Sequence, residues 1–370
     1  MYIHVNAHNL LEGLNYVTRA IAPRPAKPVL EGVLFETSET GVFLTCTDGA
    51  LTIRTHIEAH IEKTGQTVLP GKLLTELVRK LPQGVVDINV NERNIATIKC
   101  LSSRTSLTCM APIDFPLMQV LENGQSVNLP QNIFREMIQK VIFAIATDES
   151  RQILTGCLLE VTPSEARLIG LDGFRLALQR YNNTFVLPDE TTKLQAVIPG
   201  KVLGEMSKIL ADDDAPVHFT FDKTRLFAQF GNTCVSSVLL AGEYINYKQI
   251  LPTDWKTRVK VNRNELNDAI DRASLMAREG KNNLIKLHIT SADMTLSSNA
   301  ELGDMQETIG IQIEGGEMDI AFNARYLSDV IRNISDEELC MRFNSNVSPC
   351  VICPAEGEKY TYLVLPVRVF

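Results

Sequence analysis

The sequence is poor in the groups on which most enzymes and sequence-specific DNA-binding proteins depend. It has six histidines and one tryptophan in 370 residues, and the histidines form no His-Glu-x-x-His pattern. It contains no Gly-x-Ser-x-Gly motif that would present a nucleophilic serine. It also lacks zinc-finger spacing, a recognition-helix signature and an aromatic run that would stack on bases. We therefore expect neither catalysis nor the reading of a base sequence.

Long apolar runs and a cysteine framework are missing as well. No stretch approaches the ~18 consecutive apolar residues of a membrane span, and residues 1–13 do not read as a secretory signal. Eight cysteines are scattered without framework spacing, and Cys350 and Cys353 form the only close pair. A zinc site would need a second pair or suitably spaced histidines. We expect reduced, buried thiols, no metal, no cofactor and a cytoplasmic protein that does not bind membranes.

Two local patterns could suggest a ligand site but favour ordinary structure. Residues 65–72, GQTVLPGK, have one residue too many between the glycines for a phosphate-binding loop. Leu73 also stands where such a loop places the Ser or Thr that binds magnesium. The acidic run at 212–214 follows a predicted helix and precedes a proline, which is typical of a solvated turn.

The chain contains three copies of a helical pattern. Residues 68–77, VLPGKLLTEL, and 197–206, VIPGKVLGEM, are identical at six of ten positions. Residues 323–334, NARYLSDVIRNI, repeat the apolar spacing i, i+1, i+4, i+8, which predicts one face of a helix. Lys72, Lys201 and Arg325 occupy the equivalent position in the first turn. The predicted apolar faces comprise Leu73, Leu74, Leu77, Val78 and Leu81 in the first copy, Val202, Leu203, Met206 and Leu210 in the second, and Tyr326, Leu327, Val330, Ile331 and Ile334 in the third.

A second helix type recurs at intervals of 123 and 132 residues, the length of a domain. Asn9, Asn132 and Asn264 each precede a helical pattern, and we expect their side chains to cap it. Between the helices lie short β-type runs broken by turns, with Asp48-Gly49 and Asp172-Gly173 at matching points.

These repeats predict an α+β fold of three similar domains, each with two helices and about eight strands in antiparallel sheets. The predicted domains are residues 1–126, 127–252 and 253–370. A row of such domains leaves unpaired sheet edges at both ends. Closure with a second copy of the chain into a symmetric ring would remove them.

The charges are distributed unevenly. The formal net charge is −8, yet the six helical windows together carry +5, which leaves −13 for the rest of the chain. That separation predicts a basic helical surface that contacts the DNA backbone without reading bases. The alternative is that Lys and Arg merely flank ordinary amphipathic helices of an acidic scaffold that never meets DNA.

The segment 168–178, LIGLDGFRLAL, allows three interpretations. It could be a plain hairpin, or an Arg and an aromatic residue could form the mouth of an apolar pocket for a peptide. It could also be the active-site loop of an enzyme, for which Asp172 and Arg175 are the only titratable pair.

Four segments spread over the whole chain resemble the bacterial polymerase III beta sliding clamp family. They are RPAKPVLEGVLFE, LDGFRLA, EYINYKQILP and YLVLPVRVF. The resemblance implies a non-catalytic DNA clamp fold, a head-to-tail homodimer whose six domains form a ring with helices around double-stranded DNA. It also implies as partners the catalytic subunit of DNA polymerase III, an ATP-driven clamp loader and other clamp-motif proteins.

The resemblance further implies where partners bind. This sequence departs from the family at four positions. Phe174 stands where many members have His, Gln249 stands where Arg is common, Leu365 stands where Met is common, and Phe370 lies beyond the usual C-terminal residue of the family. These departures bear on the shape of the pocket and on which partners it prefers. The implied DNA contacts are Arg24, Lys72 and Lys201, and the implied dimer residues are Leu107, Leu275 and Met276. The implied peptide pocket comprises Leu154, Leu171, Gly173, Phe174, Arg175, Leu176, Ile245, Gln249, Ile250, Val347, Pro349, Leu363, Val364, Leu365, Pro366, Val367 and Arg368.

Overall fold

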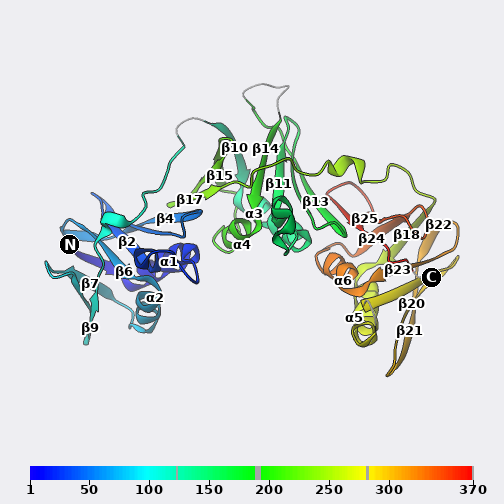
Figure 1. Ribbon diagram of the computed structural model, residues 1–370, viewed down its shortest axis with the longest axis horizontal. Helices are drawn as coiled ribbons and strands as arrows, with labels where there is room; N and C mark the ends of the chain where they lie inside the picture. Colours follow the sequence, from blue (N-terminus) through cyan, green and yellow to red (C-terminus); the bar gives the residue numbers. More distant parts are fainter. Residues whose placement is uncertain (122–123, 188–192, 281–282, 369–370) are drawn as a thin grey trace. The chain divides into compact units, whose positions relative to one another are not determined.

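The computed structural model describes residues 1–121, 124–187, 193–280 and 283–368 (Figure 1). Its contacts divide the chain into two compact units. Unit 1 comprises Met1–Asn132 and Lys208–Leu239, and unit 2 comprises Ile133–Ser207 and Leu240–Phe370. The domain boundaries near residues 126 and 252 stay a prediction. None of the helices in the described ranges combines the length and the apolar content needed to cross a bilayer.

Unit 1 contains two antiparallel sheets and two helices. Helix α1 (Ala7–Val17) packs on β3, on β4 and against α2 (Gly71–Lys80). The five-stranded sheet has the order β5-β1-β7-β8-β9, and the eight-stranded sheet has the order β10-β15-β16-β17-β4-β3-β2-β6. Their bounds are β1 Tyr2–Asn6, β2 Gly32–Thr37, β3 Gly41–Thr47, β4 Leu51–Glu58, β5 His60–Lys63, β6 Gln66–Pro70, β7 Val85–Val90, β8 Ile95–Cys100, β9 Ser103–Thr108, β10 Gln125–Pro130, β15 Pro216–Phe221, β16 Arg225–Phe230 and β17 Thr233–Val238.

Unit 2 also combines helices with two antiparallel sheets, of nine and four strands. Helix α3 (Gln131–Val141) starts at the end of unit 1 and continues here, followed by α4 (Gly200–Met206), α5 (Arg263–Glu279) and α6 (Ala324–Arg332). The sheets have the orders β14-β11-β12-β13-β26-β25-β24-β18-β22 and β21-β20-β19-β23. Their bounds are β11 Gly156–Val161, β12 Glu165–Leu171, β13 Arg175–Asn182, β14 Leu194–Pro199, β18 Thr257–Asn262, β19 Leu284–Ile289, β20 Asp293–Ala300, β21 Gly303–Gly310, β22 Gln312–Gly315, β23 Met318–Asn323, β24 Glu338–Phe343, β25 Cys350–Pro354 and β26 Tyr360–Val364.

The repeated helix prediction is confirmed for α2, α4 and α6. Each helix follows directly on a strand, and Lys72, Lys201 and Arg325 are each its second residue. This arrangement also leaves no loop for phosphate between β6 and α2. The predicted apolar face is wrong at Leu73, which is 56% exposed, whereas its counterpart Val202 is 3% exposed. Spacing along a helix shows which residues share a face, but not whether another element covers the whole of it.

The predicted caps are placed too late in the sequence. The N-cap of α1 is Asn6, whose side chain accepts a hydrogen bond from the N–H of His8 at 2.9 Å, and the N-cap of α5 is Asn262. Asn9, Asn132 and Asn264 therefore lie inside the first turns of α1, α3 and α5. A cap needs extended backbone, which the last residue of the preceding strand supplies. The strands run further than their apolar alternation indicated.

Turns and thiols follow the sequence expectation. Gly49 and Gly173 adopt φ of +95° and +94° in the β3–β4 and β12–β13 hairpins, a conformation that favours glycine. The acidic run at 212–214 is an exposed bend. All eight cysteines are free, and all but Cys234 are buried. Within the described ranges no cluster of three or more His, Cys, Asp or Glu could hold a metal.

Candidate functional site

The hairpin between β12 and β13 is the centre of the predicted peptide pocket. Asp172 Oδ1 accepts hydrogen bonds from the backbone N–H of Phe174 at 2.8 Å and of Arg175 at 3.0 Å, so the side chain shapes the turn. Strand β13 pairs with β26, and the N–H of Leu365 donates to the carbonyl oxygen of Phe174 at 2.9 Å. The C-terminal segment is therefore tied to the turn by backbone hydrogen bonds.

An apolar cluster lies beneath this hairpin. Leu154, Leu171, Leu176 and Leu363, all predicted pocket residues, are at most 3% exposed and pack together with neighbouring buried side chains. Partly buried side chains lie against them. The predicted residues among these are Ile245 and Leu365, and the others are Ala146, Ile153, Leu240, Tyr244 and Leu251. The structure thus brings segments from the β11–β13 region, the 240–251 connection and the C-terminal strand into one apolar cluster.

The connection at 240–251 is anchored through a buried polar contact. The hydroxyl of Tyr247, a member of the cluster, donates to Glu160 Oε1 at 2.9 Å, and Arg167 donates to the same carboxylate oxygen at 3.1 Å. Burial raises the pKa of Tyr247 to about 12. Burial by itself would raise the pKa of Glu160, but the Tyr247 hydrogen bond and the cations around it lower it overall. Glu160 is therefore ionised and holds Tyr247 in place.

The other predicted pocket residues lie around the cluster. Among the predicted residues that the structure describes, Gln249, Ile250, Val347 and Pro349 lie outside the cluster. Gln249 and Ile250 are exposed and follow the cluster residue Tyr247 in sequence, and Val347 and Pro349 lie in the β24–β25 loop. Val364 is buried in β26, Gly173 and Arg368 are exposed, and Pro366 is half-buried, while Phe370 lies outside the described residues. Val367 donates its N–H to Ala321 O at 2.8 Å and helps to line a cavity of about 310 Å³ together with Lys286, Asp319, Ile320, Ala321 and Asn346.

Phe174 and Arg175 play different parts from one another. Phe174 is 56% exposed, and its ring stacks on Tyr326 of α6 with centroids 5.7 Å apart. Arg175 is only 7% exposed, and its guanidinium donates to Asp172, Asp329 and the carbonyl oxygen of Phe143. Asp172 and Arg175 form an ion pair with each other at 3.0 Å. The only titratable pair that the active-site interpretation had is therefore engaged within the turn.

Tyr326, which stacks on Phe174, was not among the predicted pocket residues. The sequence placed it on the apolar face of a helix, a position typical of core residues, and gave no sign of its aromatic partner 152 positions away in the numbering, Phe174. The signal available in the sequence was that Tyr326 occupies the helix position that Leu73 and Val202 occupy in the other two copies. An aromatic residue where the other copies have aliphatic ones indicates a local difference in what covers the helix.

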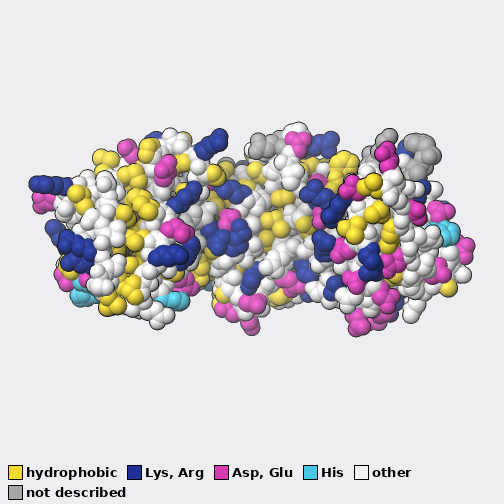
Figure 2. Space-filling model, turned by 90° about the horizontal axis from the view of Figure 1, so that it is seen from below, with side chains coloured by type: hydrophobic (Ala, Val, Ile, Leu, Met, Phe, Trp, Pro, Cys, Tyr) yellow, Lys and Arg dark blue, Asp and Glu magenta, His cyan; other side chains and the backbone are white. Residues whose placement is uncertain are grey.

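The predicted DNA contacts are all exposed cations. Arg24 and Lys72 belong to unit 1, and Lys201 belongs to unit 2. Figure 2 shows the chain from below the view of Figure 1, and on the surface of each unit that is seen there Lys and Arg side chains lie with Asp and Glu side chains among them. The face is therefore mixed in charge, which suits modest contacts with a backbone better than tight binding.

The predicted dimer residues lie at sheet edges or beside them. Leu107 is half-buried in β9, the edge strand of the five-stranded sheet. Leu275 is 58% exposed on α5, which packs on β20 and on the edge strand β21, and Met276 beside it is half-buried. In the part of the chain that the structure describes, neither β9 nor β21 has a second strand partner. Both edges can accept another chain.

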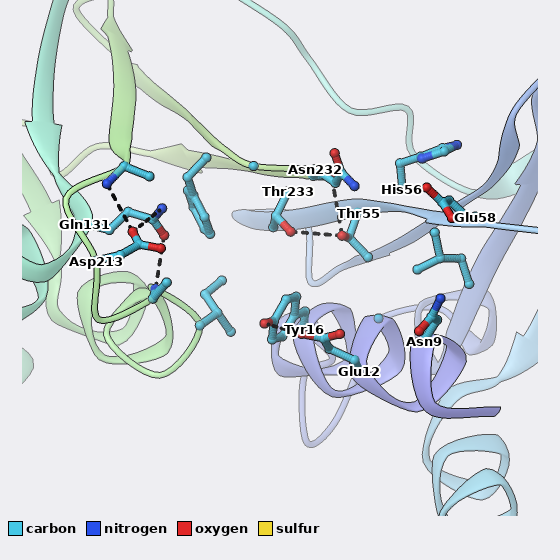
Figure 3. A pocket seen from close by; sticks show the side chains of 17 residues that line it. Asn9, Glu12, Tyr16, Thr55, His56, Glu58, Gln131, Asp213, Asn232 and Thr233 are labelled. Carbon is cyan, nitrogen blue, oxygen red and sulfur yellow. Dashed lines mark hydrogen bonds between the residues drawn. The ribbon is translucent and has the colours of Figure 1, made fainter. Parts of the chain in front are cut away.

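Unit 1 also contains a cavity of about 580 Å³ that the sequence did not suggest (Figure 3). Helix α1, strand β4 and the segments around residues 211 and 232 line it. Glu12 accepts from the Tyr16 hydroxyl at 2.9 Å, and the hydroxyls of Thr55 and Thr233 bond each other at 2.9 Å. Gln131 donates to Asp213 at 3.4 Å. Much of its polar lining is thus hydrogen-bonded within the unit.

Comparison with known proteins agrees with this architecture. Family models described as the N-terminal, central and C-terminal domains of the DNA polymerase III beta subunit match residues 1–119, 128–246 and 248–368. A beta sliding clamp of Staphylococcus epidermidis is 30% identical over 367 residues, 96% of each chain. Solved structures of the DNA polymerase sliding clamp from Bacillus subtilis and of the DNA polymerase III beta subunit from Thermotoga maritima are 32% and 27% identical, with TM-scores of 0.95 and 0.93 over 100% of each chain. The predicted α+β fold of three similar domains is confirmed. The chain therefore belongs to the family of DNA polymerase III beta subunits, the beta sliding clamps, and its role in replication is that of a non-catalytic DNA sliding clamp and processivity factor.

Proposed function

We propose that this clamp binds partner proteins through the apolar surface formed by the cluster around Leu176, the exposed ring of Phe174 and the C-terminal residues from Leu365 to Arg368. The observation that supports it is the meeting of three distant segments in one cluster, with half-buried members at its margin. Half-buried apolar side chains beside hydrogen-bonding backbone are the usual basis for capturing a short peptide with apolar anchors. The partners would be the catalytic subunit of DNA polymerase III, the clamp loader and other clamp-motif proteins.

A binding measurement with surface variants tests this proposal. A short fluorescein-labelled peptide with Leu and Phe anchors is titrated with the clamp and followed by fluorescence anisotropy, beside a peptide whose anchors are Ala. The expected result is saturable binding of the anchored peptide, weakened about tenfold by Phe174→Ala. Val186→Ala is a matched control, because Val186 is 91% exposed in unit 2 and is not among the proposed residues. Equal binding of the two peptides would contradict the proposal.

We further propose that two copies close head to tail into a ring, with the β9 edge of one chain against the β21 edge of its partner. The free edges and the exposed Leu275 support it, and so does Leu73. Leu73 is exposed in the first copy, whereas at the equivalent helix position Val202 of the second copy is buried and Tyr326 of the third is half-buried, so a partner chain would supply the missing cover of Leu73. Leu107 and Met276 would lie at the same seam.

Mass and topology test the ring. We expect sedimentation to show a dimer that Leu107→Arg converts to monomer, whereas Leu117→Arg, at a position 81% exposed and outside β9, leaves it intact. A clamp placed on circular DNA should remain there and leave after the circle is cut once. Equal retention on both forms would indicate plain electrostatic binding. Arg24, Lys72 and Lys201 would contact the backbone of the duplex, and the cytoplasm is where such a complex works.

A further inference from the structure

The guanidinium of Arg175 is fully engaged inside unit 2. Nε donates to Asp172 Oδ2 at 3.0 Å, one terminal nitrogen donates to Asp329 Oδ2 at 2.5 Å, and the other donates to Phe143 O at 2.6 Å. The group also lies over the ring of Tyr326, 4.8 Å from its centroid. All three guanidinium nitrogens are therefore bonded, and the side chain faces inward. A partner peptide would have to break these bonds in order to bind the guanidinium directly.

These contacts join two elements that are far apart in sequence. Asp172 belongs to the β12–β13 turn, and Asp329 belongs to α6. The ring pair formed by Phe174 and Tyr326 crosses the same gap, at 5.7 Å and an interplanar angle of 19°. The ion pairs lie beneath the stacked rings, because Arg175 is buried whereas Phe174 is exposed. The polar contacts thus fix how far the turn stands from the helix, and hence the geometry of the exposed rings.

We propose that Arg175 is a positioning residue for partner binding, not a contact to the partner, and that Asp329 acts with it as a second positioning residue. The proposal rests on the peptide-binding function proposed above. A guanidinium suits this role because its planar donors are directional and hold two carboxylates in fixed places, which the single ammonium of a lysine does not. A ligand that lies on a preformed surface loses less free energy to the ordering of side chains than one that must order the surface itself.

Asp329 distinguishes positioning from direct contact. It is 30% exposed on α6 and is bonded to Arg175. If Arg175 positions the rings, Asp329→Asn should weaken binding of the fluorescein-labelled Leu/Phe peptide about three- to tenfold, and Asp329→Glu, which keeps the carboxylate, should weaken it less. Arg175→Gln should weaken binding at least as much as Asp329→Asn. The double variant should be no weaker than Arg175→Gln alone, because both changes remove one shared contact.

Arg325→Gln is the matched control. Arg325 lies on the same helix, 3.9 Å from the same oxygen of Asp329, but it is 73% exposed and has no such contact with the turn. The expected affinity is that of the wild type. Thermal unfolding of each variant reports whether the fold is kept, and if Arg175→Gln does not fold, the near-isosteric Asp329→Asn decides by itself.

The outcomes separate the two proposals. If the wild type binds the Leu/Phe peptide no better than the Ala peptide, the peptide-binding function fails. If the wild type binds it but Asp329→Asn has unchanged affinity while Arg175→Gln loses affinity, Arg175 contacts the partner directly and the positioning role is overturned. Additive losses in the double variant would overturn it as well.

Discussion

Leu176→Arg should destabilise unit 2 strongly rather than only block a binding site. Leu176 is 2% exposed and lies in the cluster with Leu154 and Leu363. Losing a fully buried leucine costs about 1.5–3 kcal/mol, and an unpaired guanidinium in an apolar cluster costs several kcal/mol more. The sum, about 4 kcal/mol or more, is a large share of the ~5–15 kcal/mol that stabilises a domain.

Phe174→Ala is the contrasting change on the same hairpin. Its ring is 56% exposed, so the variant loses mainly the stack on Tyr326, worth about 0.5–1.5 kcal/mol. The two variants should therefore differ in stability by about 3 kcal/mol, although both should bind peptide poorly. Loss of binding by Leu176→Arg would report on folding, whereas loss by Phe174→Ala would report on the surface.

Urea unfolding followed by tryptophan fluorescence measures this difference. Trp255 is the only tryptophan and belongs to unit 2, where it lies under the guanidinium of Arg342 at 4.3 Å. The expected result is a much lower urea midpoint for Leu176→Arg and a nearly unchanged one for Phe174→Ala. A wild-type midpoint for Leu176→Arg would refute the reasoning, because it would show that the cluster yields to a charge without loss of packing.

Three further predictions concern the C-terminal segment, a histidine and a thiol. Deletion of residues 366–370 removes one wall of the cavity at Val367 but no buried strand. The clamp should therefore bind the labelled peptide more weakly, which lowers the peptide's anisotropy, while the urea midpoint of the clamp should not change. An unchanged affinity would exclude this segment from the site. The hydrogen bond to Asp87 raises the pKa of His4 in the folded protein. The stability that protonated His4 contributes is therefore present below the ordinary histidine pKa of about 6.5 and is lost as the pH rises through the raised pKa. The unfolding free energy lost in His4→Gln should thus be larger at about pH 6 than at about pH 9, and a pH-independent loss would contradict this. The pKa of Cys340 is lowered by its hydrogen bond with Cys353 and by the guanidinium of Arg258, which lies 3.1 Å from the sulfur. Thiolate absorbance should therefore appear below the pH at which a free cysteine ionises, and it should move to higher pH in Arg258→Gln. An unchanged titration in Arg258→Gln would remove the guanidinium as a cause.

Periodicity and repeats in the sequence were sufficient for the architecture. The Pro-Gly-Lys segments predicted α2 and α4, and the apolar spacing predicted α6, because the faces of helices must alternate with a period set by backbone geometry. The two Asp-Gly turns were likewise predictable, since few residues tolerate a positive φ. The resemblance of short segments then led to the family.

Tertiary structure decided what each predicted residue does. The family resemblance placed Phe174 and Arg175 together as pocket residues, yet the ring is exposed and the guanidinium is bonded inside unit 2. The sequence took Leu73 for a core residue and gave Tyr326 no role in the site. Burial and partnership depend on which distant segment covers a residue, and a one-dimensional pattern contains no information about that. The sequence by itself determined three copies of one fold; only packing between distant segments decided which of the predicted side chains are exposed and which are bonded inside a unit.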